Sequence, residues 1–379
     1  ARWAKINFQA GSGAQSGDSG YDTDGDMASL PENITGVGIM SADPSVNPEF
    51  FDWNTVYVWY CDGGSYLGDK DETSTVDGQT LYFRGKTVLE GVIKTLLNDH
   101  KMSDASDVVL TGSSAGGIAT IHQCDNVGYL VADSASDATY KCLADAAFFV
   151  NTTDFDGGVG TWTSQWETMV DIHGAISSMS SSCTDEHEGN EWHCWFADTA
   201  LAYVTHDIFL VQSVMDLFQL PYNFFSSELS DAQAGHDCLD NPLRKCTYAT
   251  FAGIQSFREQ LLVKLKEVAS SSSTVSYFVD ACFKHTQTDR NSIFMIPIVS
   301  DSTISMSIHR WLQGDNVRDL DEEPWPHQNQ QCDWGPEWEQ YMDSGSSSKL
   351  MISTDDFMDM LQPGGHGEDG NAHEGAQRH

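Results

Sequence analysis

The stretch "DVVLTGSSAGGIATIHQCD", residues 107–125, combines the features of a strand, a tight turn and a helix. Residues 107–111 are a short apolar run, residues 112–117 are all small, and the residues that follow suit a helix. Gly112, Ser114 and Gly116 fall in the G-x-S-x-G register, in which a sharp turn lifts a serine hydroxyl above a sheet. The five-residue pattern alone fits an ordinary Gly/Ser-rich connection equally well. The flanking strand and helix favour Ser114 as a nucleophile.

The rest of the chain alternates apolar runs with segments of helical spacing. The apolar runs lie at residues 3–9, 55–61, 107–112, 142–150, 207–213 and 274–282. Between the last of these runs and the one before it, a stripe of apolar side chains from Phe251 to Val268 predicts a helix that faces the core. This alternation is typical of an α/β fold with a mostly parallel central sheet flanked by helices. We expect one domain over residues 1–362 and an acidic Gly/His-containing tail, residues 363–379, that is flexible.

The charge and hydropathy exclude several classes of function. The chain has 56 acidic and 19 basic residues, a formal net charge of −37, which disfavours nucleic acid and anionic membranes as partners. This acidity can gather cations or basic partners, or simply form a solvated surface, and we favour the second reading. No apolar run approaches the roughly 20 residues that cross a bilayer. We predict no cofactor. We also predict no metal, because the paired C-x-x-C spacing of a zinc site is absent.

The cysteines and sequons indicate a secreted protein. Nine cysteines are spread along the chain, which favours disulfides in an oxidising compartment. Asn33 and Asn151 stand in N-x-S/T sequons and are candidate glycosylation sites. Spacing suggests the pairs Cys124–Cys142, Cys183–Cys194 and Cys238–Cys246, and Cys282 can bond to Cys332. Connectivity does not follow from spacing alone, so other pairings stay open.

A nucleophilic serine needs a histidine base and a carboxylate that orients it. In α/β-hydrolases the chain order is serine, acid, histidine, and the last two lie beyond the ends of later strands. His285 lies just past a predicted strand and follows every plausible acid. Asp216 and Asp145 are the candidate acids, and Asp216 fits better because it lies nearer the strand that precedes the base. The backbone N–H of Ala115, the residue after the nucleophile, is expected to be one oxyanion-hole donor.

Several sequence blocks, in order over nearly the whole chain, resemble the pectin acetylesterase/Notum family of secreted serine carboxylesterases. These blocks are "YDT", "YCDGGSYLGD", "LYFRGKTVLEGVI", "LTGSSAGG", "CLADAAFF", "FLVQSVMDLFQL", "ACFKHTQ" and "PWPHQNQQC". The resemblance implies an α/β-hydrolase fold, with Ser114 as nucleophile, Asp216 as acid and His285 as base. It also implies that an early loop supplies a second oxyanion donor, here Ser12 or Gly13, although "AGSGAQ" departs from the family's Gly-Gly-Trp.

The resemblance further implies that a cysteine-containing segment of the family, expected to precede this sequence, is missing. In the family the cysteine of "YCDG" pairs with that segment, so we predict that Cys61 has no partner within residues 1–379.

Two hypotheses of function follow. The first is a secreted or cell-surface serine esterase without a cofactor, acting through an acyl-enzyme on acetylated polysaccharide or acylated protein. The second is a catalytically silent extracellular binding or structural protein that keeps the esterase fold, supported by the altered early loop and the acidity. We favour the first, because a chain relieved of catalysis has no chemical reason to keep a serine, an aspartate and a histidine in their expected contexts.

Overall fold

A computed structural model describes residues 3–9, 36–59, 63–76, 78–158, 161–225, 247–294 and 299–322. All of these belong to one compact unit. The predicted boundary at residue 362 and the predicted tail, residues 363–379, lie outside the described residues. The domain assignment therefore stays a prediction.

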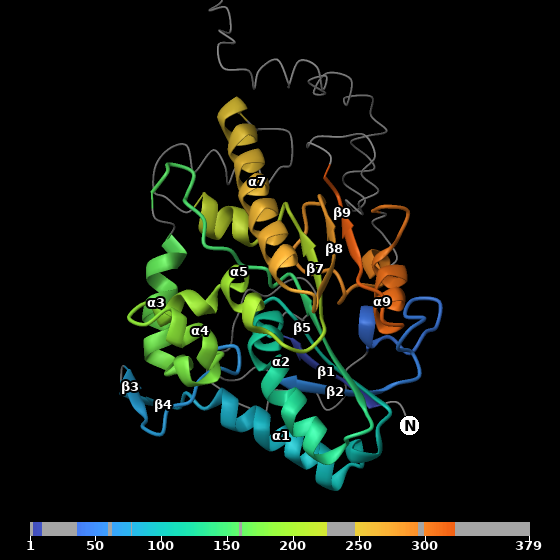
Figure 1. Cartoon of the computed structure of the whole chain (residues 1–379). Helices are drawn as coiled ribbons and strands as arrows, with labels where there is room; N and C mark the ends of the chain where they lie inside the picture. Colours follow the sequence, from blue (N-terminus) through green and yellow to red (C-terminus); the bar gives the residue numbers. More distant parts are fainter. Residues whose placement is uncertain are drawn as a thin grey trace, which may run out of the picture. The chain divides into compact units, whose positions relative to one another are not determined.

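The centre of the described part is a parallel sheet of seven strands (Figure 1) in the order β2-β1-β5-β6-β7-β8-β9. Its strands are β1 (Trp3–Gln9), β2 (Asn54–Trp59), β5 (Asp107–Ser113), β6 (Thr139–Asp145), β7 (Ile208–Ser213), β8 (Val275–Asp280) and β9 (Arg318–Leu320). The predicted α/β class with a mostly parallel sheet is confirmed. The strand order reverses at β1, and in open α/β sheets ligands bind at such a switch point, beyond the carboxyl ends of the strands.

Helices connect the strands and surround the sheet (Figure 1). They are α1 (Gly85–Asp99), α2 (Ala115–Ser134), α3 (Thr161–His173), α4 (Ser181–Glu186), α5 (Ala197–Ala200), α7 (Tyr248–Ser271), α8 (Asn291–Phe294) and α9 (Ile304–Leu312), with short 3-10 turns and one π turn, η7 (Leu220–Phe224). α2 packs against β1, β5 and β6, whereas α9 packs against β7 and β8. α7 is the predicted helix: Ile254, Phe257 and Leu261 of its apolar stripe are fully buried. No helix among the described residues is both long and apolar enough to cross a bilayer.

Buried side chains from alternate strand positions form the core on the α9 side of the sheet. Val109, Leu143, Phe209 and Phe278 come from four neighbouring strands and share one cluster with Trp311 of α9. Strands β7 and β8 are buried along their whole length, because helices cover both faces of a parallel sheet. This burial fixes the positions of the strand ends, from which the polar side chains of the site extend.

The structure corrects the strand expected over residues 142–150. β6 ends at Asp145, because Ala146 has a φ of 49°, a left-handed conformation that no strand continues through. Two features escaped the sequence pattern: the short edge strand β9, and a small hairpin of β3 (Ser74–Val76) and β4 (Gln79–Leu81). Strands of three residues are too short to show a period.

Candidate active site

Ser114 lies at the sharp turn between β5 and α2. Its φ of 56° and ψ of −121° are unusual for a residue with a side chain, as expected of a strained strand-to-helix turn. α2 begins at Ala115, whose backbone N–H therefore has no acceptor within the helix. A Cβ on Gly117 would meet the Ala147 side chain at 2.5 Å and the backbone oxygen of Asp145 at 2.9 Å. The glycine thus lets the helix start close to the ends of the strands.

The structure brings Ser114, His285 and Asp216 together from the ends of three different strands. Ser114 Oγ lies 2.8 Å from His285 Nε2. His285 Nδ1 lies 3.1 Å from each carboxylate oxygen of Asp216. Because a carboxylate only accepts, Nδ1 carries the proton and Nε2 is left to accept from the serine. This is the geometry that general-base activation of a serine requires.

Asp216 is fully buried and accepts hydrogen bonds on both carboxylate oxygens. Its Oδ1 accepts from the backbone N–H groups of Phe218 and Gln219 at 2.8 and 2.9 Å, and its Oδ2 accepts from Gln212 Nε2 at 3.0 Å. Such donors satisfy the oxygens of a buried carboxylate, which would be costly to leave unpaired. The same donors fix the carboxylate plane toward His285.

His285 lies in a loop just after β8, with its side chain about one fifth exposed. Burial by itself lowers the pKa of an imidazole, but the adjacent carboxylate of Asp216, with further contributions from Asp145 and Asp289, raises the pKa of His285 above its usual value. The imidazolium that would form during proton transfer is therefore stabilised where it is needed.

Aromatic rings lie next to His285. The ring of Phe218 stacks on the imidazole with centroids 5.1 Å apart, and Phe149 meets it edge-on at 6.3 Å. Trp162 contacts both phenyl rings, and Tyr222 extends the row as an exposed residue. These rings form an apolar cluster on one side of His285, and the stacked ring of Phe218 restricts the orientation of the imidazole.

Two polar residues of this network were missed in the sequence. Gln212 Oε1 accepts from the backbone N–H of Phe148, and Gln219 bonds to both Phe148 and Val150. Both glutamines are buried. The signal was present: a glutamine within the otherwise apolar run of β7 needs a fixed partner, since an unpaired buried amide is costly.

The other predicted site residues have varied outcomes. The structure contains the disulfides Cys124–Cys142 and Cys183–Cys194, both pairs suggested by spacing. Cys282 is also disulfide-bonded. Its suggested partner Cys332 lies outside the described residues, as do Cys61, Cys238, Cys246, Ser12, Gly13 and Asn33. Asn151 is half-buried and accepts from Thr163 Oγ1 at 3.1 Å, and its glycosylation stays a prediction.

Among the described residues, one group of side chains has the mutual spacing of metal ligands: Cys183, His187 and Cys194. Its two cysteines are joined in a disulfide. Metal binding by cysteine requires free thiolates, so the oxidised pair offers no such ligands.

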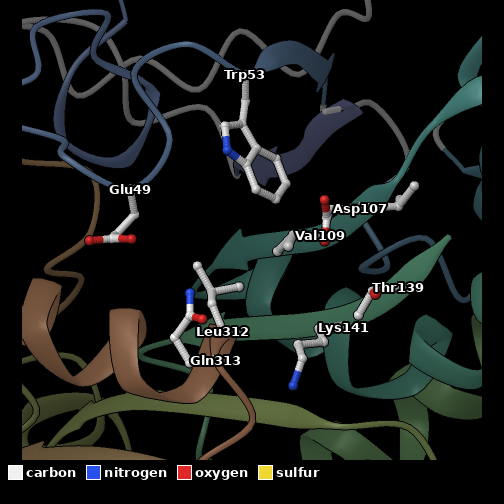
Figure 2. Close-up of a pocket in the computed structure, with 9 residues that line it drawn as sticks. Glu49, Trp53, Asp107, Val109, Thr139, Lys141, Leu312 and Gln313 are labelled. Carbon is white, nitrogen blue, oxygen red and sulfur yellow. The ribbon is translucent and has the colours of Figure 1, made fainter. Parts of the chain in front are cut away.

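A cavity of about 100 Å³ lies at the amino-terminal ends of β5 and β6, whereas Ser114 follows the carboxyl end of β5 (Figure 2). It is lined by Glu49, Trp53, Asp107, Val108, Val109, Thr139, Lys141, Leu312 and Gln313. Asp107 and Thr139 are the first residues of β5 and β6, so a strand length of about 20 Å separates this cavity from Ser114. The Lys141 ammonium is bound by Asp207 at 2.9 Å and by the backbone oxygen of Trp311 at 3.2 Å. The cavity is therefore remote from Ser114.

The sheet order, the strained serine turn and the Ser–His–Asp geometry define a protein of the α/β-hydrolase class. A family model described as Pectinacetylesterase matches residues 18–333. The chain is 31% identical to pectin acetylesterase 5 of Arabidopsis thaliana over 72% of this chain and 62% of that protein. It is 25% identical to the palmitoleoyl-protein carboxylesterase notum1a of Danio rerio, over 83% of this chain and 62% of that protein. The chain belongs to the pectinacetylesterase family, and it spans less than two thirds of the length of these two relatives.

Proposed function

We propose that this chain is a serine carboxylic ester hydrolase in which Ser114 is the nucleophile, His285 the general base and Asp216 its orienting acid. The observation that carries the proposal is the 2.8 Å approach of Ser114 Oγ to His285 Nε2, with Asp216 on the other imidazole nitrogen. Family membership supports it, because the relatives are named as acetylesterases and carboxylesterases.

The proposed reaction follows the usual steps of a serine esterase. Ser114 Oγ attacks the acyl carbon while its proton passes to His285 Nε2, and Asp216 stabilises the imidazolium. The N–H of Ala115, at the positive end of α2, stabilises the oxyanion, with a second donor proposed from Ser12 or Gly13. His285 then returns the proton to the leaving alkoxide. Water, activated by the same imidazole, hydrolyses the acyl-enzyme.

For the substrate we propose an acyl ester of a polysaccharide or of a protein, with an acetyl ester as the first to test. The 31% identity to a pectin acetylesterase exceeds the 25% identity to a palmitoleoyl-protein carboxylesterase. We also propose that the protein acts outside the cell, since disulfides such as Cys124–Cys142 persist in oxidising compartments.

A fluorophosphonate probe and a series of 4-nitrophenyl esters of increasing acyl length test the proposal. The probe should label the wild type and fail to label Ser114→Ala, which should also lose ester hydrolysis while keeping its circular dichroism spectrum. Ser134→Ala is the matched control, since Ser134 is an exposed residue at the far end of the same helix. A folded wild type that neither reacts with the probe nor hydrolyses any ester would instead favour a non-catalytic binding protein.

A further inference from the structure

Asp145, the last residue of β6, is a fully buried carboxylate that the three proposed catalytic residues do not include. Its Oδ2 accepts four hydrogen bonds: from Ser113 Oγ at 3.2 Å, and at 2.8 Å each from the backbone N–H of Gln287, the backbone N–H of Thr288 and Thr288 Oγ1. Its backbone oxygen also accepts from the N–H of Ser114 at 2.8 Å. One residue thus bonds both to the turn that carries the nucleophile and to the loop that follows the base.

Three residues linked to Asp145 by sequence or by its hydrogen bonds have a left-handed backbone. Ser114, Ala146 and Thr286 have φ values of 56°, 49° and 62°. Left-handed backbone is costly for residues with a Cβ, most of all for a β-branched threonine. Such conformations persist only where the surroundings hold them. Asp145 is bonded to Ser114, precedes Ala146, and accepts from the two residues after Thr286.

A second buried carboxylate supports the same loop from β8. Asp280 accepts from the backbone N–H of Cys282 at 2.8 Å and from Gln287 Nε2 at 2.7 Å. Gln287 therefore bridges the two carboxylates, with its backbone N–H on Asp145 and its side chain on Asp280. The loop that carries His285 is held by side chains from the ends of two strands, β6 and β8, which flank β7 in the sheet.

We propose that Asp145 is a positioning residue of the esterase: its carboxylate locks the loop of His285 to the turn of Ser114 and so sets the distance between base and nucleophile. The inference rests on the proposed function and deepens it. Asp145 does not itself touch the reacting atoms, and it acts through Ser114 and His285. A displacement of about 1 Å in such a pair can cost about 100-fold in rate.

The negative charge of Asp145 adds a readout that a purely structural role lacks. The carboxylates that face His285 are Asp216, Asp145 and Asp289, and those that face Asp145 are Asp289 and Asp280. Removing one negative charge from this group disfavours the imidazolium and lowers the pKa of His285. The acid limb of the kcat/KM profile should then move to lower pH.

Asp145→Ala and Asp145→Asn, assayed with 4-nitrophenyl acetate, test the proposal. Asp145→Ala should lose about 100-fold in kcat with little change in KM, because the reacting pair is displaced. Asp145→Asn keeps an oxygen for the four donors, since Oδ1 has no hydrogen-bond partner among the described residues. It should recover most of kcat while its acid limb lies below that of the wild type.

Asp125→Ala is the matched control. Asp125 also accepts from two consecutive backbone N–H groups, those of Thr205 and His206, but it lies away from the catalytic residues. This variant should keep the wild-type kcat and pH profile. A loss of kcat in Asp125→Ala equal to that in Asp145→Ala would overturn the proposal, because any loosened loop would then have the same effect.

Other outcomes are equally decisive. A wild-type kcat in folded Asp145→Ala overturns the proposal, and so does an Asp145→Asn variant that is no better than alanine and keeps the wild-type acid limb. If Asp145→Ala does not fold, Thr288→Val and Ser113→Ala each remove one donor and should each lower kcat at constant KM. An unchanged kcat in both variants overturns the proposal.

The wild type is measured first with the fluorophosphonate probe. A wild type without labelling or hydrolysis overturns the proposed function and this inference with it, whereas an active wild type isolates the inference.

Discussion

Replacement of Asp216 by asparagine tests the acid of the proposed catalytic triad, because either orientation of the new amide places its NH2 group against at least one hydrogen-bond donor. If the amide nitrogen replaces Oδ1, it faces the N–H groups of Phe218 and Gln219, and if it replaces Oδ2, it faces Gln212 Nε2. The second orientation opposes only one donor. We therefore expect the amide oxygen of the Asp216→Asn side chain to keep the two backbone bonds and its NH2 group to lie against Gln212.

The magnitude follows from that orientation. One buried donor loses its acceptor, which should lower the free energy of unfolding by about 1–3 kcal/mol. The NH2 group also donates to His285 Nδ1, so the imidazole proton moves to Nε2 and faces Ser114 Oγ. In that tautomer the base cannot accept the serine proton, and kcat should fall by about 10⁴-fold, equivalent to roughly 5 kcal/mol of activation free energy.

Steady-state hydrolysis of 4-nitrophenyl acetate and urea unfolding measure the two effects separately. Asp319→Asn is the control, since Asp319 is another buried carboxylate, bonded to Ser307 and Arg310 on the α9 side of the sheet. It should lose stability and keep kcat. A folded Asp216→Asn variant with a kcat close to that of the wild type would refute the tautomer argument.

Three further predictions concern pH and the disulfide of α2. Since the pKa of His285 is raised, kcat/KM should increase with pH through a midpoint above the usual imidazole value of about 6.5. A pH profile of ester hydrolysis measures this midpoint, and a midpoint below about 6.5 would contradict the assignment of His285 as base. Burial raises the pKa of Asp280 from 3.8 to about 7, so the folded state binds the proton more tightly than the unfolded state. The free energy of unfolding should therefore fall as pH rises from about 4 to about 7, by roughly 4 kcal/mol from this group, and urea titrations of Asp280→Asn should show a shallower fall. Replacing Cys124 and Cys142 together by alanine opens a loop with a sequence separation of 18 and should lower the free energy of unfolding by about 3 kcal/mol. Urea unfolding against the oxidised wild type measures the loss, and an unchanged midpoint would contradict it.

The strand ends at the site could be located from the sequence, because a local pattern of residues marks where each strand ends. The apolar run before Gly112 predicted β5, and the small residues after it predicted the strained turn at Ser114, which the structure contains. The order of serine, acid and histidine then pointed to Asp216 and His285, which the structure places within hydrogen-bond distance of each other. Each of these inferences uses residues adjacent in sequence to a strand, where periodicity is informative.

What the sequence could not supply are contacts between distant residues whose individual patterns are ordinary. Asp145 was weighed only as an alternative acid, yet it bonds to Gln287 and Thr288, which are more than 140 residues away. A single sequence contains no signal for such a pairing. The conformation of Thr286 was equally hidden, because threonine rarely adopts a positive φ and nothing local demands it.

Three buried carboxylates lie near His285, and the raised pKa values of two of them limit the negative charge there. Asp145, Asp216 and Asp280 extend from neighbouring strand ends, and full ionisation of all three in a buried site would be costly. Burial, together with the charge of Asp289, raises the pKa of Asp145 to about 6. Burial, together with the charges of Asp321 and Asp145, raises the pKa of Asp280 to about 7, so Asp280 holds a proton for part of the time near neutral pH. Asp216 accepts from three donors and also contacts the imidazole of His285. The carboxylate that contacts His285 thus has hydrogen-bond donors on both of its oxygens, and under our proposal the other two hold the loop.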